Sequence, residues 1–394
     1  MRLLNDVAVE NRKILNHLLH EMPDSGDSGA DLTDLVLDPD FPNEKAVSLL
    51  EGFGFSSPTS ARKHLEELAT ERHRFISDRR CRHFLAAIIQ PLLTEIETTP
   101  DPDITLRNLA EVSDSIGGKG SLWELFQTNR KCLHLYVTIC ANAPYLSSIL
   151  NNNPGMLDEL MDSLMLGSTP ESSALENELA FSCRGTNDIN PIVHGFKNSK
   201  HLQIGVRDLV RNENLGVTLR AIADVAECCL RQIIANEFSQ LVEKFGTPQA
   251  NDRDCDYAIL TFGKVGGQEP NYHSDLNFLV VFDADGETKH KTTSRQTSNQ
   301  HFFNQLVSKS IKQITRPSST GRLYDLECPI FGIQEDGLEA FSCEALDRFF
   351  TERKTTFRSF LNLTQARIIH GSPENRECIE EIVSRHIEQF EITP

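Results

Sequence analysis

The spacing of apolar residues changes sharply after Gly246, and this change constrains the fold more than any other feature of the sequence. From about residue 215 to 245, apolar side chains recur every three or four residues along one broad stripe, which predicts a long helix. Beyond it, residues 257–262 and 276–282 are short apolar runs rich in β-forming residues, the first of them bounded by Gly263. The sequence therefore predicts a long helix that leads into a mixed α/β region.

The rest of the chain divides by its helical spacing and its turn-rich segments. A further helix is predicted around Phe302–Ile314, a third strand over 321–327, and helices over 344–370, while 167–200 is polar and turn-rich. The predicted divisions are an N-terminal helix and linker over 1–42, a helical domain over 43–165, an α/β domain over 200–375 that contains the helix 215–245 and a sheet over about 256–330, and a C-terminal tail over 376–394. The expected fold class is α+β, with a helical bundle followed by a domain built on a small mixed sheet.

Composition excludes several classes of function. The 394 residues carry a formal net charge of −18, so no broad basic surface is expected and no nucleic-acid partner is predicted. No apolar run approaches the roughly 18–20 residues that span a bilayer, and the first residues lack the apolar core of a signal peptide. The ten cysteines form no CxxC pair, which favours reduced thiols in a cytoplasmic protein.

The glycine-rich segment after the first predicted strand is the candidate ligand loop. Gly266 and Gly267 let the backbone approach a bound group and donate its amides, and Lys264 could add a point charge beside a phosphate. The segment matches neither the Walker phosphate loop nor the GxGxxG fingerprint. A tight turn with solvated polar residues is the alternative interpretation.

Asp275 and Asn277 form the candidate metal site. They lie two residues apart at the entry to a predicted strand, so their side chains share one face. Oxygen ligands on one strand suit a hard cation such as Mg²⁺ beside nucleotide phosphates. Glu327, on the third predicted strand, is the candidate third carboxylate of a two-metal site, and Asp325 shares its strand face.

The order of these parts resembles the pattern of polymerase-β-like nucleotidyltransferases: a glycine turn, a Ser-Asp strand and a distal acidic strand. More specifically, the residues resemble signatures of the glutamine synthetase adenylyltransferase family. Gly263–Glu269 followed by Ser274–Asn277 resembles GKLGGxE…SDLDL, Gly321–Glu327 resembles GxLYEVD, Gln365–Gly371 resembles RARxVxGD, and Asn153–Leu160 resembles PxLLDELLD. The resemblance covers about residues 50–375.

The resemblance implies a fold, a reaction and roles for individual residues. Full family members join an AMP-removing half to an AMP-adding half, and this chain resembles the second half, in which a nucleotidyltransferase domain follows a helical bundle. The implied substrates are ATP and glutamine synthetase, with Mg²⁺ or Mn²⁺ as cofactor and a nitrogen-signalling regulator as a further partner. Asp275 and Glu327 would be catalytic, Asp275, Asn277 and Glu327 would hold the metal, and Lys264, Gly266, Gly267 and Ser274 would bind nucleotide.

Four departures from the family pattern bear on catalysis. The family's second Asp is Asn277 here, and its third acidic residue is Glu327 rather than Asp. The RLRP segment is replaced by Pro329–Gly332, and the Trp-Glu pair before the final Arg motif is absent. Together they predict reduced or lost activity, because a missing charge weakens cation binding. A non-catalytic regulatory or scaffold protein that keeps the fold, and a transferase with another acceptor, remain as alternatives.

Overall fold

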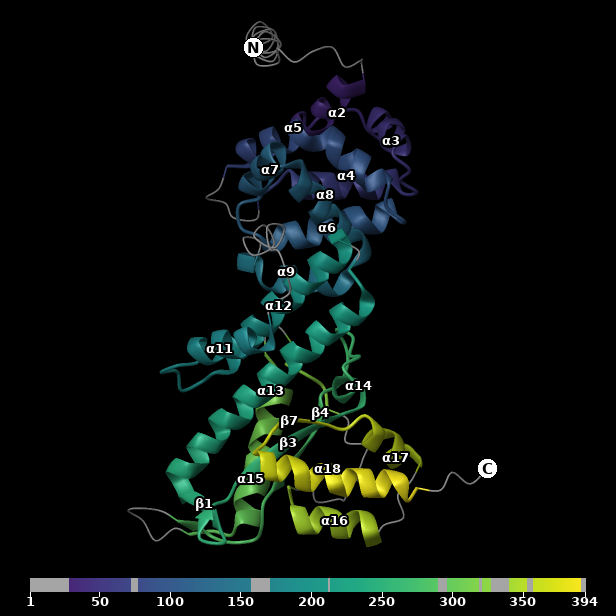
Figure 1. The fold of residues 1–394 in the computed structure, drawn as a ribbon. Helices are drawn as coiled ribbons and strands as arrows, with labels where there is room; N and C mark the ends of the chain where they lie inside the picture. The colour runs from purple at the N-terminus through teal and green to yellow at the C-terminus, as the bar shows by residue number, and fades with distance from the viewer. Residues whose placement is uncertain are drawn as a thin grey trace, which may run out of the picture. The chain divides into compact units, whose positions relative to one another are not determined.

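The computed structural model divides the chain into two compact units, the first ending at Asn142 and the second beginning at Ala143. In Figure 1 the first unit runs from purple to blue and the second from teal to yellow. The structure describes residues 28–71, 77–156, 171–211, 213–289, 296–318, 321–326, 340–352 and 357–390. The helix predicted within the first twenty residues lies outside these ranges.

The described residues of the amino-terminal unit form helices joined by loops, with no strand among them. Its helices are α2 (Ser28–Leu37), α3 (Asn43–Glu51), α4 (Pro58–Leu68), α5 (Asp78–Glu97), α6 (Pro102–Ser115), α7 (Lys119–Thr128) and α8 (Arg130–Asn142). Helix α5 packs against α2 and α7, and the apolar residues on its inner face, among them Leu85 and Leu92, are fully buried. A period of three to four apolar residues therefore produces the bundle, because each helix buries one stripe.

A buried ion network fixes the start of α7. The carboxylate of Glu71 accepts hydrogen bonds from the backbone N–H groups of Lys119 (3.1 Å) and Gly120 (2.9 Å), the first two residues of that helix. The buried amine of Lys119 donates to the carbonyl of Thr70 (2.9 Å) and to Asp114 (3.0 Å). The carboxylate thus satisfies helix-terminal donors that have no partner within the helix.

The carboxyl-terminal unit contains two small sheets and the remaining helices. The helices are α9 (Pro144–Asn152), the 3₁₀ turn η1 (Pro154–Met156), α11 (Ser172–Ser182), α12 (Asn190–Arg211), α13 (Leu215–Phe245), α14 (Gly263–Gly266), α15 (Asn299–Thr315), α16 (Cys343–Glu352), α17 (Phe357–Thr364) and α18 (Pro373–Glu388). The strands are β1 (Thr247–Ala250), β2 (Arg253–Asp254), β3 (Tyr257–Phe262), β4 (Asn277–Phe282), β5 (Thr288–Lys289), β6 (Phe341–Ser342) and β7 (Arg367–His370).

The larger sheet has the strand order β6-β4-β3-β7. Strand β3 pairs antiparallel with β4, from Tyr257 opposite Phe282 to Phe262 opposite Asn277, and antiparallel with β7 on its other side. Strand β6 pairs parallel with β4. The smaller sheet has the order β2-β1-β5. The sheet content is therefore mixed and small, as expected for an α+β fold.

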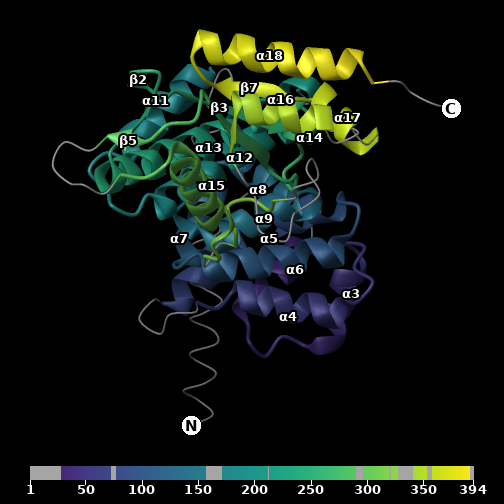
Figure 2. The same cartoon turned by 90° about the horizontal axis from the view of Figure 1, so that it is seen from below.

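Both faces of the larger sheet are covered by helices. Ile259 and Val280 pack into the core formed with α13 and α15, whereas Leu260 and Leu279 pack into the core formed with α16 and α18. Figure 1 and Figure 2 show the two helix layers on opposite sides of β3 and β4. Coverage on both faces explains why these strands are continuous apolar runs rather than alternating ones. No helix in the described ranges is both long enough and apolar enough to cross a bilayer.

Several elements lie where the apolar spacing predicts them, and others differ. Helices α13 and α15 and strands β3 and β4 match their predicted segments closely. The units separate at Asn142 rather than near residue 165, so α9 belongs to the second unit. Helix α2 occupies part of the predicted linker and is anchored by buried Leu32 and Val36. Helix α18 occupies much of the predicted tail, since Ile379 and Ile382 pack into the core beneath it.

The turn-rich interpretation of residues 167–200 is wrong for α11 and for the first half of α12. The apolar spacing does not predict helix α12, because its polar residues, including His194, Lys197 and His201, are buried inside the unit instead of facing solvent. In the segment predicted as a third strand, residues 321–326 form only an isolated bridge between Ser318 and Gly321. Part of the helical segment predicted up to residue 370 is strand β7, whose identity depends on pairing with β3.

Candidate functional site

The turn between β3 and β4 is rigid and hydrogen-bonded within itself. Gly263 begins it with a φ of +59°, a left-handed conformation that favours glycine. The single helical turn α14 follows, and the amides of Gly267 and Glu269 donate to the carbonyls of Gly263 (2.9 Å) and Lys264 (2.8 Å). These two amides are therefore engaged inside the loop, and the side chain of Lys264 is exposed to solvent.

The two adjacent glycines of the predicted nucleotide loop have different surroundings. Gly266 is buried, and a Cβ there would lie 2.2 Å from the carbonyl oxygen of Gln365 and 2.6 Å from that of Thr261. Gly267 is exposed, and its nearest contacts to an added Cβ are 3.4 Å away. Gly266 is consequently required for the close packing of the loop against the chain before β7, whereas Gly267 faces outward.

An arginine on β7 fixes the glycine loop from inside the unit. The guanidinium of Arg367 donates to the carbonyls of Gly266 (3.0 Å) and Val265 (3.1 Å). The same group pairs with the buried carboxylate of Glu227 on α13, with one hydrogen bond of 3.1 Å. Burial raises the pKa of Glu227, although the pairing with Arg367 opposes the shift. Glu227 is not among the predicted site residues, although a charged residue inside the apolar stripe of α13 is a signal for it in the sequence.

Ser274 shapes the turn that precedes β4. Its hydroxyl donates to the side-chain oxygen of Asn271 (3.1 Å) and accepts from the backbone N–H of Asn271 (2.9 Å). The Asn271 side chain also accepts from the backbone N–H of His273 (2.9 Å). The hydroxyl predicted to contact nucleotide thus closes a local turn that presents the next residue, Asp275, at the start of the strand.

Asp275 and Asn277 occupy the start of β4 as the sequence predicts. Asn277 is the first residue of the strand, and its side-chain oxygen is buried without a hydrogen-bond partner in the described structure. Most buried polar atoms of folded proteins have a hydrogen-bond partner, so a buried oxygen of this kind fits the ligand of a cation. Asp275 is half-buried two residues earlier. An amide oxygen beside a carboxylate is a donor set that suits a hard cation.

The segment that leads to the predicted third ligand lies beside these residues. The backbone N–H of Leu276 donates to the carbonyl of Asp325 at 2.9 Å. The Asp325 carboxylate is exposed and pairs with Arg322 at 3.3 Å. Glu327 lies outside the described residues. Within the described ranges, no group of three or more His, Cys, Asp and Glu side chains is placed to hold a metal ion.

A cluster of aromatic rings anchors the loop before β4 to α9 and α12. The Tyr145 hydroxyl lies 2.7 Å from Nδ1 of His201, and the Tyr145 ring stacks on Tyr272 with centroids 5.1 Å apart. His273 meets the Tyr145 ring edge-on at 5.0 Å. Burial lowers the pKa of His201 well below its usual value, so this imidazole is neutral. Sequence spacing gave no signal for the cluster, because its members are far apart along the chain.

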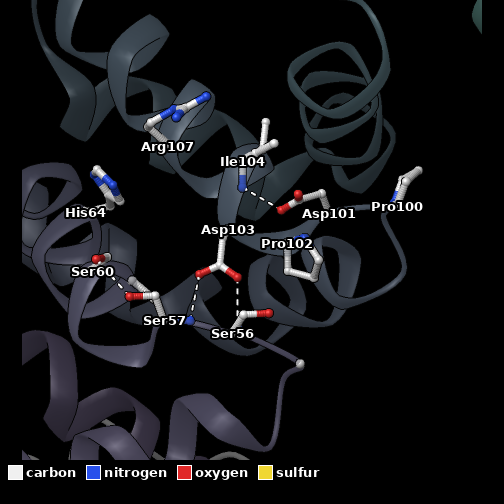
Figure 3. Close-up of a pocket in the computed structure, with 12 residues that line it drawn as sticks. Ser56, Ser57, Ser60, His64, Pro100, Asp101, Pro102, Asp103, Ile104 and Arg107 are labelled. Atoms are coloured by element: carbon white, nitrogen blue, oxygen red, sulfur yellow. Dashed lines mark hydrogen bonds between the residues drawn. The ribbon is translucent and has the colours of Figure 1, made fainter.

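The amino-terminal unit contains a separate groove of about 720 Å³ beside α4 and α6 (Figure 3). Its carboxylates have structural partners. Asp103 accepts the backbone N–H groups of Ser56 (2.8 Å) and Ser57 (3.1 Å), and Asp101 caps α6 by accepting from Ile104 (2.9 Å). The groove therefore lies where a loop meets the starts of α4 and α6. Its two carboxylates are engaged by backbone N–H groups there.

Comparison with known proteins places the chain in a family. Residues 133–382, more than half of the chain, match the model of the glutamate-ammonia ligase adenylyltransferase family. The match covers the glycine turn, both strands of the candidate site and the Arg367–Glu227 pair. The chain belongs to the glutamate-ammonia ligase adenylyltransferase family.

Individual relatives agree with this assignment. The chain is 25% identical to a bifunctional glutamine synthetase adenylyltransferase/adenylyl-removing enzyme of Rhodopseudomonas palustris, over 85% of this chain and 34% of that protein. It is 25% identical to a protein of the same name from Pseudomonas putida, over 88% of this chain and 36% of that one. The chain thus spans about a third of the length of these relatives.

Proposed function

We propose that the carboxyl-terminal unit transfers AMP from ATP to glutamine synthetase, with activity weakened by the loss of a carboxylate at position 277. The family match supports the reaction class. The observation that carries the proposal is the start of β4, where a glycine turn precedes half-buried Asp275 and the buried, unpartnered amide oxygen of Asn277. Because ATP is the proposed substrate, the cytoplasm is the proposed location of the protein.

The proposed chemistry is an in-line transfer of AMP. A Tyr hydroxyl of the acceptor attacks the α-phosphorus of ATP, a new oxygen–phosphorus bond forms, and the bond to pyrophosphate breaks as the hydroxyl loses its proton. Exposed Gly267 and Lys264 are available to the triphosphate. Gly266 and Ser274 act through the shape of the turns that they form. Positioning of the two reactants is the main contribution that such a site makes.

Asp275, Asn277 and Glu327 are proposed to hold Mg²⁺ or Mn²⁺. The unpartnered oxygen of Asn277 fits a cation ligand, and bound metal would neutralise charge on the phosphates. Because the Asn side chain has no charge, the cation is held more weakly than by two carboxylates. Weak rather than full activity is therefore the expected outcome.

A non-catalytic regulatory or scaffold protein is the second candidate. The neutral side chain of Asn277 favours it, as does the engagement of the Gly267 and Glu269 amides within the loop. Under this proposal the fold binds nucleotide or a nitrogen-signalling regulator without transferring AMP. The difference between the two candidates is the fate of the α-phosphate.

Incubation with α-labelled ATP, Mg²⁺ or Mn²⁺, and the cognate glutamine synthetase tests the proposal. Label should appear on glutamine synthetase with wild-type protein and not with Asp275→Ala. Label on another protein of a cell extract, with none on glutamine synthetase, would identify a transferase with a different acceptor. Nucleotide binding with no transfer under either metal would support the scaffold.

A further inference from the structure

A cavity of about 90 Å³ in the carboxyl-terminal unit lies between α9, α12 and Arg322. The cavity has room for several water molecules. That volume suits a compact ion and is too small for a whole nucleotide. The described residues that line the cavity include two cations, Lys197 and Arg322, and no Asp or Glu.

The amine of Lys197 is held in place by groups that do not neutralise it. Lys197 is only 9% exposed, and its amine donates to the carbonyl of Leu323. It also lies 4.2 Å from the ring centroid of Tyr324, a cation–π distance. A carbonyl and an aromatic ring stabilise the position of the ammonium but leave its net charge available to an anion.

The cavity wall also carries three asparagine side chains, and the amides of Asn152 and Asn153 each donate one hydrogen bond to a carbonyl of α9, that of Ser148 and that of Ile149 respectively. Asn152 and Asn153 come from the end of α9, and Asn198 comes from α12 beside Lys197. Arg322 is 57% exposed and forms a surface pair with Asp325, a type of pair that contributes little in water. Its guanidinium can therefore turn to a bound anion at small cost. Such fork-shaped donors favour phosphate geometry.

The cavity is connected to the candidate site through one short segment. Leu323 and Tyr324 contact Lys197, and the next residue, Asp325, accepts the backbone N–H of Leu276. An anion beside Lys197 would thus stabilise the same segment that lies along the start of β4.

We propose that this cavity binds one phosphate-type oxyanion, held by Lys197 and Arg322. Orthophosphate and the terminal phosphate of a larger ligand share the required chemistry, which is a compact group with two or more negative charges. The proposal does not depend on AMP transfer, and binding can be measured without a divalent metal or an acceptor protein. A protein that transfers no AMP could still bind the anion, so the two proposals fail separately.

Titration of the full chain with orthophosphate, pyrophosphate or ATP, each in metal-free buffer and followed by calorimetry and thermal unfolding, tests the site. Arg322→Gln should weaken binding about tenfold or more, as expected for a lost charge-assisted hydrogen bond. Arg316→Gln is the matched control, because Arg316 is 58% exposed and forms a comparable surface pair with Asp188. Lys197→Met should abolish binding, and its fold is checked by circular dichroism.

Arg322→Gln decides the result even if Lys197→Met fails to fold, since Arg322 is a surface residue. Saturable orthophosphate binding that this variant weakens identifies a free anion. Binding confined to pyrophosphate or ATP and weakened by the same variant identifies a phosphate of a larger ligand. The proposal is overturned if no probe binds saturably, if Arg322→Gln leaves binding unchanged, or if Arg316→Gln weakens it equally.

Discussion

The side chain at position 277 determines whether the candidate metal site has one more carboxylate. Asn277→Asp adds a carboxylate where the side-chain oxygen is already buried and unpartnered. If the protein is a weakened enzyme, AMP transfer should rise by about tenfold, which corresponds to about 1.4 kcal/mol, or the metal concentration required should fall. Initial rates across a Mg²⁺ and Mn²⁺ series measure the change.

Asp275→Ala provides the control for this experiment, because it should abolish transfer in both the wild-type and the Asn277→Asp background. Transfer that stays undetectable in wild type and in Asn277→Asp would favour the scaffold. The departure at Pro329–Gly332 would then be sufficient to prevent catalysis.

The adjacent glycines of the loop offer a test at the same scale. Gly266→Ala places a methyl group against two backbone carbonyls and should destabilise the protein by about 1–3 kcal/mol or more. Gly267→Ala meets only ordinary contacts in a right-handed helical conformation and should change stability by less than about 1 kcal/mol. Urea unfolding of both variants measures the difference, and equal destabilisation would contradict the assigned packing.

The pKa of Lys197 gives a prediction about pH. Burial lowers this pKa from 10.5 to about 8, against opposing effects of Cys229 and Asp325. Between those two values the unfolded chain holds one more proton than the folded chain, so stability rises with pH in this window. From pH 7 to pH 9, in phosphate-free buffer, wild type should gain about 1 kcal/mol relative to Lys197→Met. A parallel pH dependence of the two proteins would contradict this.

At the scale of elements, the Arg367–Glu227 pair joins α13, α14 and β7. Arg367→Met removes the hydrogen-bonded partner of the buried Glu227 carboxylate, which keeps only the longer 3.6 Å pair with Arg231, and should destabilise the protein by about 3 kcal/mol. The loss should be larger at pH 8 than at pH 5, because the buried carboxyl that has lost Arg367 can take up a proton in the folded state at the lower pH. Denaturant unfolding at both pH values measures it.

Two further variants separate the pair from general effects of charge. Glu227→Gln combined with Arg367→Met should recover part of the loss, since the buried carboxylate is then removed together with its arginine partner. Arg253→Met removes an arginine that is 57% exposed and should change stability by less than about 1 kcal/mol. The Arg367→Met variants also test the glycine loop. A rise in their KM for ATP without unfolding would indicate that the loop has moved.

At the scale of the whole molecule, the two compact units predict two unfolding events. Leu92 is fully buried in the first unit and Leu306 is fully buried in the second. Each Leu→Ala substitution should cost about 2–5 kcal/mol through the cavity that it leaves. Scanning calorimetry should show that Leu92→Ala shifts one transition and Leu306→Ala the other. A single transition shifted equally by both would contradict independent units.

Local spacing along the chain predicts the elements whose apolar residues follow a clear period: α13, α15, β3 and β4. It also placed the glycine turn and Asp275 and Asn277 at the start of a strand, because strand entry and turn chemistry depend on neighbouring residues. Local spacing was sufficient there, since each of these elements buries side chains that are close together along the chain.

The remaining features depend on contacts that exist only in the folded chain. Helix α12 carries buried polar residues such as Lys197, so its pattern resembles an exposed segment until its partners are known. Strand β7 and the Arg367–Glu227 pair depend on contacts between residues more than a hundred positions apart. The requirement for glycine at position 266 arises from the carbonyl of Gln365, which no local pattern reveals. Such features depend on chain segments that meet only after folding, and therefore leave no periodic signal.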